Sequence, residues 1–422
     1  MSELIEKLEH HEHILKRPDS YVGSTSKTSE LYWVLENSDF VQENLVYSPA
    51  LLKIFDEILV NAIDRNSLYP DNTKNIKVLC DRQTGIISIE NDGPLGGIHV
   101  QIHEKEQVYN PELTFGHLLT SSNYDDSEKR TVGGRNGYGA KLTNIYSSIF
   151  SVTIFDAENQ VKYSQKWENN MQKVSKPKIT KYSGKSSKVN IAFVPDWKRF
   201  GMTGMDVDFY KIIEKRVFDA SYCTSSKCSV FFQNQKLKKF SNDDYAKLYL
   251  EENTKLCTVS SPRWCVSVAP SSEGHHHISF VNGICTTKGG THVDYISKII
   301  SDGIIEELAK KIKLRPQQVK NTFFVCVKCT LENPSFSSQV KSECTLKIQE
   351  FGSRFDPPKS FIKNVLKTGV QDEVLSLSKF REMKELKKSD GNRRSRITGI
   401  PKLDDANAAG TTKSSKCTLI LT

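Results

Sequence analysis

The sequence has no long apolar run, and this absence argues against an α-helical membrane protein. No stretch approaches the roughly 18 uncharged apolar residues that a membrane-spanning helix needs. The first residues, Met1-Ser2-Glu3, lack the basic and then apolar pattern of a secretory signal peptide. We find no internal repeat and no long low-complexity tract in the 422 residues. We therefore expect a soluble globular protein without a membrane partner.

Cysteine is also scarce, because ten cysteines are scattered over 422 residues. This usage fits an intracellular, reducing compartment. Cys326 and Cys329 form a C-x-x-C pair inside an apolar run, and no second pair lies nearby at zinc spacing. We expect both in the core of a strand. Residues 275–277 are three histidines, but successive strand residues point to opposite faces, so we expect a surface strand there and no metal site.

The residues that are present describe an ordinary globular chain. Hydrophobic residues make up 37% and charged residues 26%, which excludes disorder for most of the chain. The length suggests two or three domains. The formal net charge of +9 indicates a mild preference for an anionic partner.

The order of apolar and turn segments predicts an arm followed by two domains. We expect an arm at 1–30, a first domain at 31–238, a second at 239–405, and the truncated start of a further domain at 406–422. In the first domain we expect a helix at 49–66, strands near 75–80 and 86–91, and alternating strands from 150 to 235. In the second we expect strands at 263–269, 278–285 and 322–331, and helices at 292–312 and 358–379. Strands alternating with helices favour a mixed α/β fold.

The predicted helix after Ser48-Pro49 carries a polar stripe. A hydroxyl followed by proline is a helix-start signal. At 100° per residue, one face is apolar and would pack on a sheet: Leu51, Leu52, Phe55, Ile58, Leu59 and Ala62. Glu57, Asn61 and Asp64 fall on the opposite side. This side is either solvated, or it directs a carboxylate that could polarise water and an amide oxygen that could bind Mg²⁺ into a cleft.

Two glycine-rich segments follow. The strand at 87–91 runs into Asn91-Asp92-Gly93, which is either a plain turn or a ligand contact at a strand end. Residues 133–141 contain four glycines and a lysine before a helical run. Successive backbone N–H groups and a helix start would suit a phosphate. The spacing differs from both the P-loop and the dinucleotide fingerprint, and a purely structural loop remains an alternative.

In combination these motifs resemble the GHKL ATPases. Further blocks resemble the eukaryotic-type DNA topoisomerase II family more closely, and they span nearly the whole chain: 15–24, 115–126, 165–170, 289–293, 332–336 and 388–391. The resemblance implies an α+β fold, with a Bergerat-type α/β sandwich ATPase domain followed by an α/β transducer domain. It also implies that the chain stops before a metal-binding domain that takes part in DNA cleavage.

The resemblance further implies ATP and Mg²⁺ as cofactors and assigns roles to residues. Glu57 would be the general base, Asn61 would hold Mg²⁺, and Asn91 would contact the adenine side. Ribose and phosphate contacts would come from Ser121, Ser122 and Asn123. The triphosphate would be wrapped by Gly134, Arg135, Asn136, Gly137, Tyr138, Gly139, Ala140 and Lys141.

Other implied contacts come from the arm and from the second domain. Gln339 and Lys341 would reach the γ-phosphate, with Val340 standing where the family usually has threonine, and Tyr21 would reach the nucleotide of a partner subunit. A cation that touches only the γ-phosphate loses that partner after hydrolysis, which could change domain orientation. The loop at 94–97 is longer than the family pattern, so we expect a different shape there.

Two basic runs are candidates for contact with duplex DNA or are simply solvated. One contains Lys310, Lys311 and Lys313, and the other spans 381–396. We therefore predict an ATP-operated homodimeric clamp of a type IIA topoisomerase, in the nucleus or in a viral or host compartment. The alternatives are a GHKL chaperone or mismatch-repair clamp acting on protein partners, and a non-catalytic nucleotide-binding scaffold.

Overall fold

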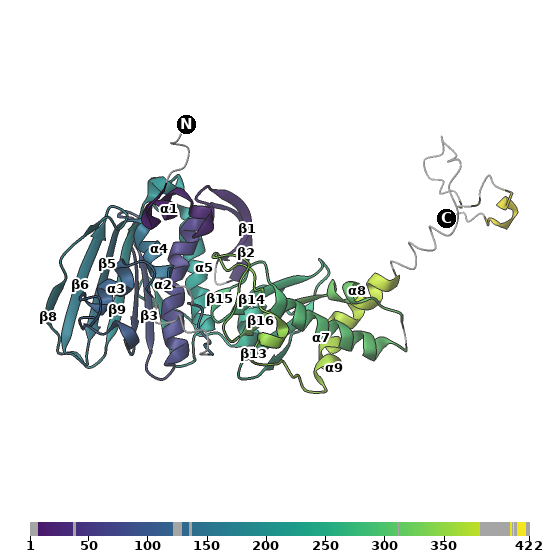
Figure 1. Ribbon diagram of the computed structural model, residues 1–422. Coiled ribbons are helices and arrows are strands. Elements are labelled where there is room, and N and C mark those ends of the chain that lie inside the picture. The colour runs from purple at the N-terminus through teal and green to yellow at the C-terminus, as the bar shows by residue number, and fades with distance from the viewer. Residues whose placement is uncertain are drawn as a thin grey trace.

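Two β-sheets of unequal size, each with its own helices, organise the chain (Figure 1). The computed structural model describes residues 7–36, 39–120, 129–134, 137–310, 312–379, 406, 408 and 412–418. A two-stranded antiparallel ribbon, β1 (Thr28–Glu36) and β2 (Asp39–Tyr47), precedes the large sheet. Over the described residues, no helix is both long and apolar enough to cross a membrane.

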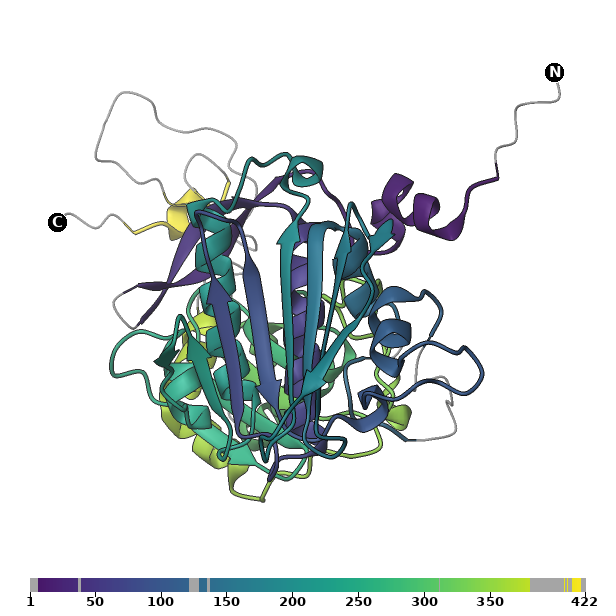
Figure 2. The ribbon, with the colours of Figure 1, turned by 90° about the vertical axis from the view of Figure 1, so that its left-hand side faces the viewer.

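The large sheet has nine strands in the order β11-β10-β3-β4-β9-β5-β6-β7, with β8 also paired to β6. Its strands are β3 (Asn75–Cys80), β4 (Ile87–Asp92), β5 (Ser147–Asp156), β6 (Val161–Glu168), β7 (Lys173–Val174), β8 (Lys178–Lys181), β9 (Lys188–Pro195), β10 (Ser229–Phe232) and β11 (Gln235–Lys236). The β10–β3 pair is parallel, and the other pairs are antiparallel. One face is covered by helices and the other is open toward the viewer in Figure 2.

The helices of this first part are α1 (His10–Lys16), α2 (Pro49–Leu68), α3 (Asn110–Gly116), α4 (Gly139–Ile145) and α5 (Val207–Cys223). Short 3₁₀ turns lie at Pro18–Ser20, Gly96–Ile98 and Trp197–Phe200. Helices α2, α4 and α5 pack together over the same face of the sheet (Figure 1). Their apolar sides and the sheet form one core, which fixes the position of α2.

The second part is a five-stranded sheet in the order β12-β13-β16-β14-β15. Its strands are β12 (Cys257–Ser260), β13 (Trp264–Pro270), β14 (His276–Val281), β15 (Ile284–Cys285) and β16 (Phe323–Cys329). Its helices are α6 (Asn242–Lys247), α7 (Thr291–Leu308), α8 (Pro316–Lys320) and α9 (Phe361–Val365). Helix α9 continues through a π-helical turn at Leu366–Val370 into a helix at 371–379, and 3₁₀ turns lie at Ile348–Glu350 and Ser414–Lys416.

Strand β16 is buried on both faces and joins two clusters. Phe323, Val325 and Cys329 belong to the core under α7, whereas Phe324 and Cys326 belong to an aromatic cluster facing α5 and α6. This alternation follows from the two-residue period of a strand. The C-x-x-C cysteines therefore point to opposite faces. Both are buried in a core strand, as predicted, and all ten cysteines are free.

The mixed α/β organisation predicted from sequence is confirmed, but some of its elements differ from those expected. The stretch expected as alternating strands at 150–235 contains the 17-residue helix α5. The strand expected at 278–285 is a hairpin whose turn is Asn282-Gly283, with φ of 49° and 76°. The helix expected at 358–379 is interrupted where Gly369 takes a φ of 115°.

Candidate nucleotide site

Helix α2 brings the acidic candidates of the first domain into the interior. Ser48 Oγ accepts the N–H of Leu51 at 3.4 Å, and Pro49 occupies the first turn, so the helix begins where the sequence predicts. Glu57 and Asp64 are 4% and 8% exposed, whereas Asn61 is exposed. The two carboxylates therefore do not lie on a solvated face, whereas the side chain of Asn61 is accessible.

Glu57 lies between two buried ammonium groups. Lys53, one turn earlier on α2, forms an ion pair with Glu57 Oε1. Lys341, from the second domain, places Nζ 3.1 Å from the same oxygen and is itself 7% exposed. Burial alone would raise the pKa of Glu57, but the charges of Lys341 and Lys53 and their hydrogen bonds outweigh it and hold the pKa at about 2. Burial lowers the pKa of Lys53 to about 8.

Helix α4 begins directly against this carboxylate. A Cβ on Gly139, the first residue of α4, would lie 2.0 Å from Glu57 Oε2. Glycine is therefore the residue that lets the end of the glycine loop approach Glu57 this closely. Gly137 and Tyr138 precede the helix, and Ala140 and Lys141 form its first turn.

Asp64 holds the start of the glycine loop. Its Oδ1 accepts the N–H of Gly133 at 2.9 Å, and its Oδ2 accepts the N–H of Gly134 at 3.0 Å. Burial raises the pKa of Asp64 to about 6 even though both amide hydrogen bonds lower it. Two backbone donors are thus directed at a carboxylate of α2, and they position the segment that leads into the loop.

Asn61 lies beside the same loop and retains an accessible oxygen. Its Oδ1 is 3.6 Å from the position that a Cβ on Gly134 would take. Glu57 and Asp64 are already engaged by lysines and amides. Mg²⁺ takes oxygen ligands and usually keeps several waters and phosphate oxygens among them, so the amide oxygen of Asn61 fits the predicted ion.

Lys141 stabilises the glycine loop through two hydrogen bonds to backbone carbonyls. Its Nζ donates to the carbonyl oxygens of Thr120 at 2.5 Å and Gly137 at 2.6 Å, and the side chain is 3% exposed. Burial lowers the pKa of Lys141 to about 8. The lysine thus joins both ends of the stretch between α3 and α4, a connection that the sequence did not indicate.

The Asn-Asp-Gly segment ends strand β4 at the edge of this region. Asn91 is half-buried and donates through Nδ2 to the carbonyl of Asp92 at 3.1 Å. Asp92 Oδ1 accepts the N–H groups of Lys74 and Asn75, and so it fixes the start of β3. The longer loop that follows forms the turn Gly96–Ile98, and Leu95 before it is buried.

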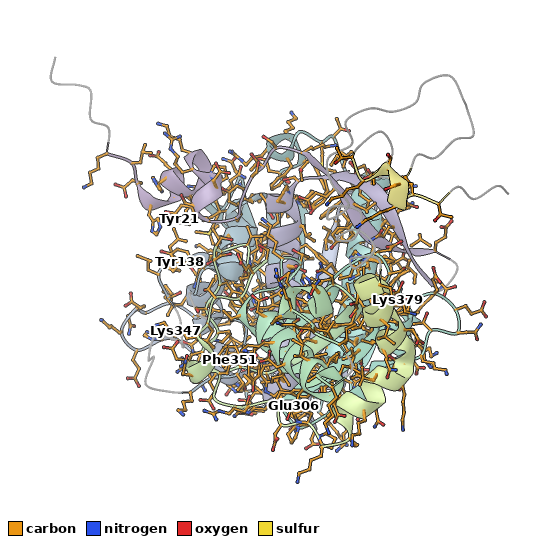
Figure 3. The ribbon with its side chains drawn as sticks, turned by 90° about the vertical axis from the view of Figure 1, so that its right-hand side faces the viewer. Tyr21, Tyr138, Glu306, Lys347, Phe351 and Lys379 are labelled. Atoms are coloured by element: carbon orange, nitrogen blue, oxygen red, sulfur yellow. The ribbon has the colours of Figure 1, made fainter. Side chains whose placement is uncertain are left out.

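The arm packs on its own chain above the glycine loop. Ile14 and Val22 are fully buried in the first core. The rings of Tyr21 and Tyr138 have centroids 6.2 Å apart, and His13 Nδ1 is 2.9 Å from the Tyr21 hydroxyl. Figure 3 shows Tyr21 and Tyr138 on the same side of the molecule. Tyr21 therefore lies at the loop of its own subunit, and contact with a partner subunit stays a prediction.

The second-domain loop enters the site through a tight turn. Lys341 N–H donates to the carbonyl of Ser338 at 3.0 Å, and Lys341 has a φ of 62°. Its Nζ lies 3.4 Å from the carbonyl of Gly133 as well as beside Glu57. Gln339 belongs to the same turn and is half-buried.

Some of the predicted site residues lie outside the described part of the chain: Ser121, Ser122, Asn123, Arg135, Asn136 and Lys311. The basic run at 381–396 also lies outside it. Lys310 and Lys313 are described and exposed, between α7 and α8. Among the residues that the structure places, no group of three or more His, Cys, Asp or Glu could hold a metal ion, and His276 is exposed at the start of β14.

Several solved structures have the same fold as this chain. The ATPase region of Saccharomyces cerevisiae topoisomerase II is 40% identical, with a TM-score of 0.85 over 90% of this chain and 99% of that chain. The ATPase and transducer domains of Balamuthia mandrillaris topoisomerase II are 36% identical, with a TM-score of 0.86 over 90% and 99%. The ATPase domain of Thermus thermophilus gyrase B, at 16% identity and a TM-score of 0.56, shares the fold.

The sequence comparisons point to the same family as the solved structures do. Residues 231–354 match the family model for DNA gyrase B. DNA topoisomerase 2 of Candida glabrata is 42% identical over 443 residues, and a probable DNA topoisomerase 2 of Dictyostelium discoideum is 44% identical over 435. These alignments cover 100% of this chain but 31% and 28% of the two relatives.

The fold is thus that of a GHKL ATPase domain followed by a transducer domain, as predicted. The chain belongs to the type II DNA topoisomerase family and corresponds to the ATPase region of its members. It spans about a third of the length of the relatives it matches. The matches do not support the alternative of a chaperone or mismatch-repair clamp.

Proposed function

We propose that this chain binds and hydrolyses ATP with Mg²⁺ and forms the N-terminal clamp of a type IIA DNA topoisomerase, coupling ATP turnover to DNA strand passage. The observation that carries the proposal is the contact between Glu57 and Lys341, 3.1 Å apart and buried, because it joins the ATPase domain to the transducer at one carboxylate. Family membership supplies the reaction class.

In this proposal Glu57 removes a proton from the attacking water. A carboxylate whose pKa is held at about 2 is a weak base. A γ-phosphate would compete with Glu57 for Lys341, and loss of that cation would raise the pKa of Glu57 toward a more effective value. Departure of the phosphate would return Lys341 to Glu57, so the transducer loop has different partners before and after hydrolysis.

The remaining predicted contacts complete the site. Asn61 would hold Mg²⁺, which when bound neutralises charge on the phosphate oxygens. Asn91 would contact the adenine side, and Gln339 would accompany Lys341. Ribose and phosphate contacts are assigned to Ser121, Ser122 and Asn123, and the triphosphate to Gly134, Arg135, Asn136, Gly137, Tyr138, Gly139, Ala140 and Lys141.

The proposed partners are a second copy of the chain and duplex DNA. The arm with Tyr21 would cross to the other subunit, and Lys310, Lys311 and Lys313 would contact DNA phosphates. The relatives from yeasts and Dictyostelium favour a nuclear location. Imaging of the full-length tagged protein tests this location, and exclusion from DNA-containing compartments would contradict it.

Steady-state ATP hydrolysis with and without duplex DNA tests the proposal. Wild type is expected to turn over ATP, and DNA is expected to accelerate it. Glu57→Gln should bind nucleotide but lose roughly 100-fold or more in turnover, because the general base is gone. Glu306→Gln is the matched control, since Glu306 is an exposed carboxylate of α7 (Figure 3). Nucleotide binding without turnover in wild type would instead indicate a non-catalytic scaffold.

A further inference from the structure

The segment 130–134, here called the approach segment, leads into the glycine loop, and the second domain holds its backbone. Asn333 accepts the N–H of Arg130 through Oδ1 at 3.1 Å, and the Asn333 N–H donates to the Arg130 carbonyl at 2.8 Å. Asn282 Nδ2 donates to the Val132 carbonyl at 3.4 Å. These contacts come in addition to that of Lys341 with Gly133.

Side-chain packing closes the same interface. A Cβ on Gly133 would lie 2.7 Å from Ile284 Cδ1, and one on Gly283 would lie 2.6 Å from Ile63 Cγ2. The β14–β15 hairpin therefore fits between the approach segment and α2 without spare space. A displacement of the hairpin would press on both of them.

The holding residues are themselves firmly placed in the transducer. Asn282 binds Leu331 twice, with Oδ1 accepting its N–H at 2.8 Å and Nδ2 donating to its carbonyl at 2.9 Å. Asn333 has a φ of 44°, a conformation that asparagine tolerates better than most residues. Glu332 before it pairs with Arg263 at 2.9 Å.

The other end of the approach segment is fixed to the ATPase domain. The N–H groups of Gly133 and Gly134 donate to Asp64, and the glycine loop follows immediately. The segment thus spans the distance from Asn333 to Asp64 in five residues. The position of this segment therefore sets where the backbone N–H groups of the glycine loop lie.

We propose that Asn333 is a positioning residue for nucleotide binding, through which the transducer holds the glycine loop independently of Lys341. The proposal rests on the ATPase function proposed above. It adds a connection between the domains that does not pass through the γ-phosphate. Binding of ATP would therefore depend on the transducer even where Lys341 makes no contact.

Two substitutions separate this role from backbone strain. Asn333→Gly keeps the positive φ and the bond from the 333 N–H, but it removes the oxygen that accepts the Arg130 N–H. Asn333→Asp restores an oxygen at that place and tolerates the same φ. Asn253→Gly is the matched control, because Asn253 is an exposed asparagine of the second domain with a φ of 69°.

We expect Asn333→Gly to raise the KM for ATP about fivefold, the effect of one lost hydrogen bond, with a smaller change in kcat. Amide exchange in a peptide covering 129–134 should accelerate by a similar factor without nucleotide. Asn333→Asp and Asn253→Gly should match wild type in both measurements.

Each contrary outcome has a distinct meaning. Unchanged exchange in Asn333→Gly would show that the side chain does not hold the segment, and faster exchange with an unchanged KM would show that holding it does not matter for binding. A melting temperature far below that of Asn253→Gly would assign Asn333 to the fold alone. All three would overturn the inference. Absence of ATP turnover in wild type would instead overturn the proposed function.

Discussion

At the residue scale, Glu57 is a buried carboxylate that lies between two buried cations. Lys53 and Lys341 both contact one carboxylate, and the neighbouring Asp64 has a pKa raised to about 6 by burial. A buried charge that loses its partner is costly. A triphosphate that took the place of Glu57 beside Lys341 would give that cation a new partner, and so the cluster suits the function proposed for it.

Lys341→Met tests the electrostatic part of this argument. The pKa of Glu57 is about 2, below its ordinary value of 4.5, so the ionised group stabilises the fold above about pH 4.5 and this contribution is lost as the pH falls toward 2. A pKa lowered by this much corresponds to about 3 kcal/mol in the free energy of unfolding. The variant should be less stable than wild type at pH 7 by about 3 kcal/mol, because a buried carboxylate loses one cation. It should also lose less stability between pH 4.5 and pH 2.

Melting temperatures followed by circular dichroism from pH 7 to pH 2 provide the measurement. Lys347→Met is the control, since Lys347 is an exposed lysine of the same domain (Figure 3). Equal melting temperatures for the two variants at pH 7, or equal acid sensitivity of Lys341→Met and wild type, would show that Lys341 does not set the charge of Glu57.

The sequence indicated some of these residues and hid others. Glu57 and Lys341 were both predicted as functional, but their contact joins positions 284 residues apart, which no local pattern shows. Lys53 was accessible to sequence reasoning, because i,i+4 pairs face each other on a helix. The partners of Asp64 could not be predicted from the sequence, since they depend on how the glycine loop folds over α2.

At the element scale, the start of α4 lies close to α2. In an exposed helix, alanine in place of glycine would stabilise by roughly 1 kcal/mol. At Gly139 the added Cβ would meet Glu57 Oε2 at 2.0 Å, so the carboxylate would have to move. We expect Gly139→Ala to lower ATP turnover roughly 100-fold, the effect of displacing a reacting group by about 1 Å.

Turnover at saturating ATP provides the comparison for Gly139→Ala. Gly204→Ala is the matched control, because no atom lies within 4 Å of the corresponding Cβ position. Wild-type turnover in Gly139→Ala would mean that Glu57 tolerates displacement, which would weaken its assignment as the general base.

Elements with strong local signals were predicted well. Helix α2 was expected at 49–66 and occupies Pro49–Leu68, because its start signal and apolar period agree. Helix α5 was missed, although Asp206 caps it and Phe209, Ile213 and Val217 recur at helical spacing. The period was present in the sequence, so this error was one of interpretation. The helix at 358–379 was predicted without a break, although Gly369, which takes a φ of 115°, lies within it.

At the whole-molecule scale, the two domains meet at contacts that lie far apart in sequence. Asn282, Asn333 and Lys341 all reach the backbone of the approach segment. Local signals in the sequence predicted two domains, whereas the coupling lysine was implied by the family resemblance. It could not predict the interface, since complementary surfaces of separate domains leave no periodic pattern.

The proposed clamp requires that the arm leave its own subunit when two chains join. Ile14 and Val22 are fully buried, but Tyr21 is held mainly by a contact with His13 and by neighbouring rings. The Tyr21 side chain can therefore leave its own subunit at a lower cost in free energy than Ile14 or Val22.

We expect wild type to form a dimer with a non-hydrolysable ATP analogue. Tyr21→Ala should weaken this dimer at least about 30-fold, because buried tyrosines often contribute 2 kcal/mol or more at interfaces. Tyr21→Phe, which retains the ring, should dimerise nearly as well as wild type. Sedimentation velocity over a range of concentrations measures the dimer, and analogue binding is measured in parallel. If Tyr21→Ala binds the analogue and dimerises like wild type, the subunit contact lies elsewhere on the arm.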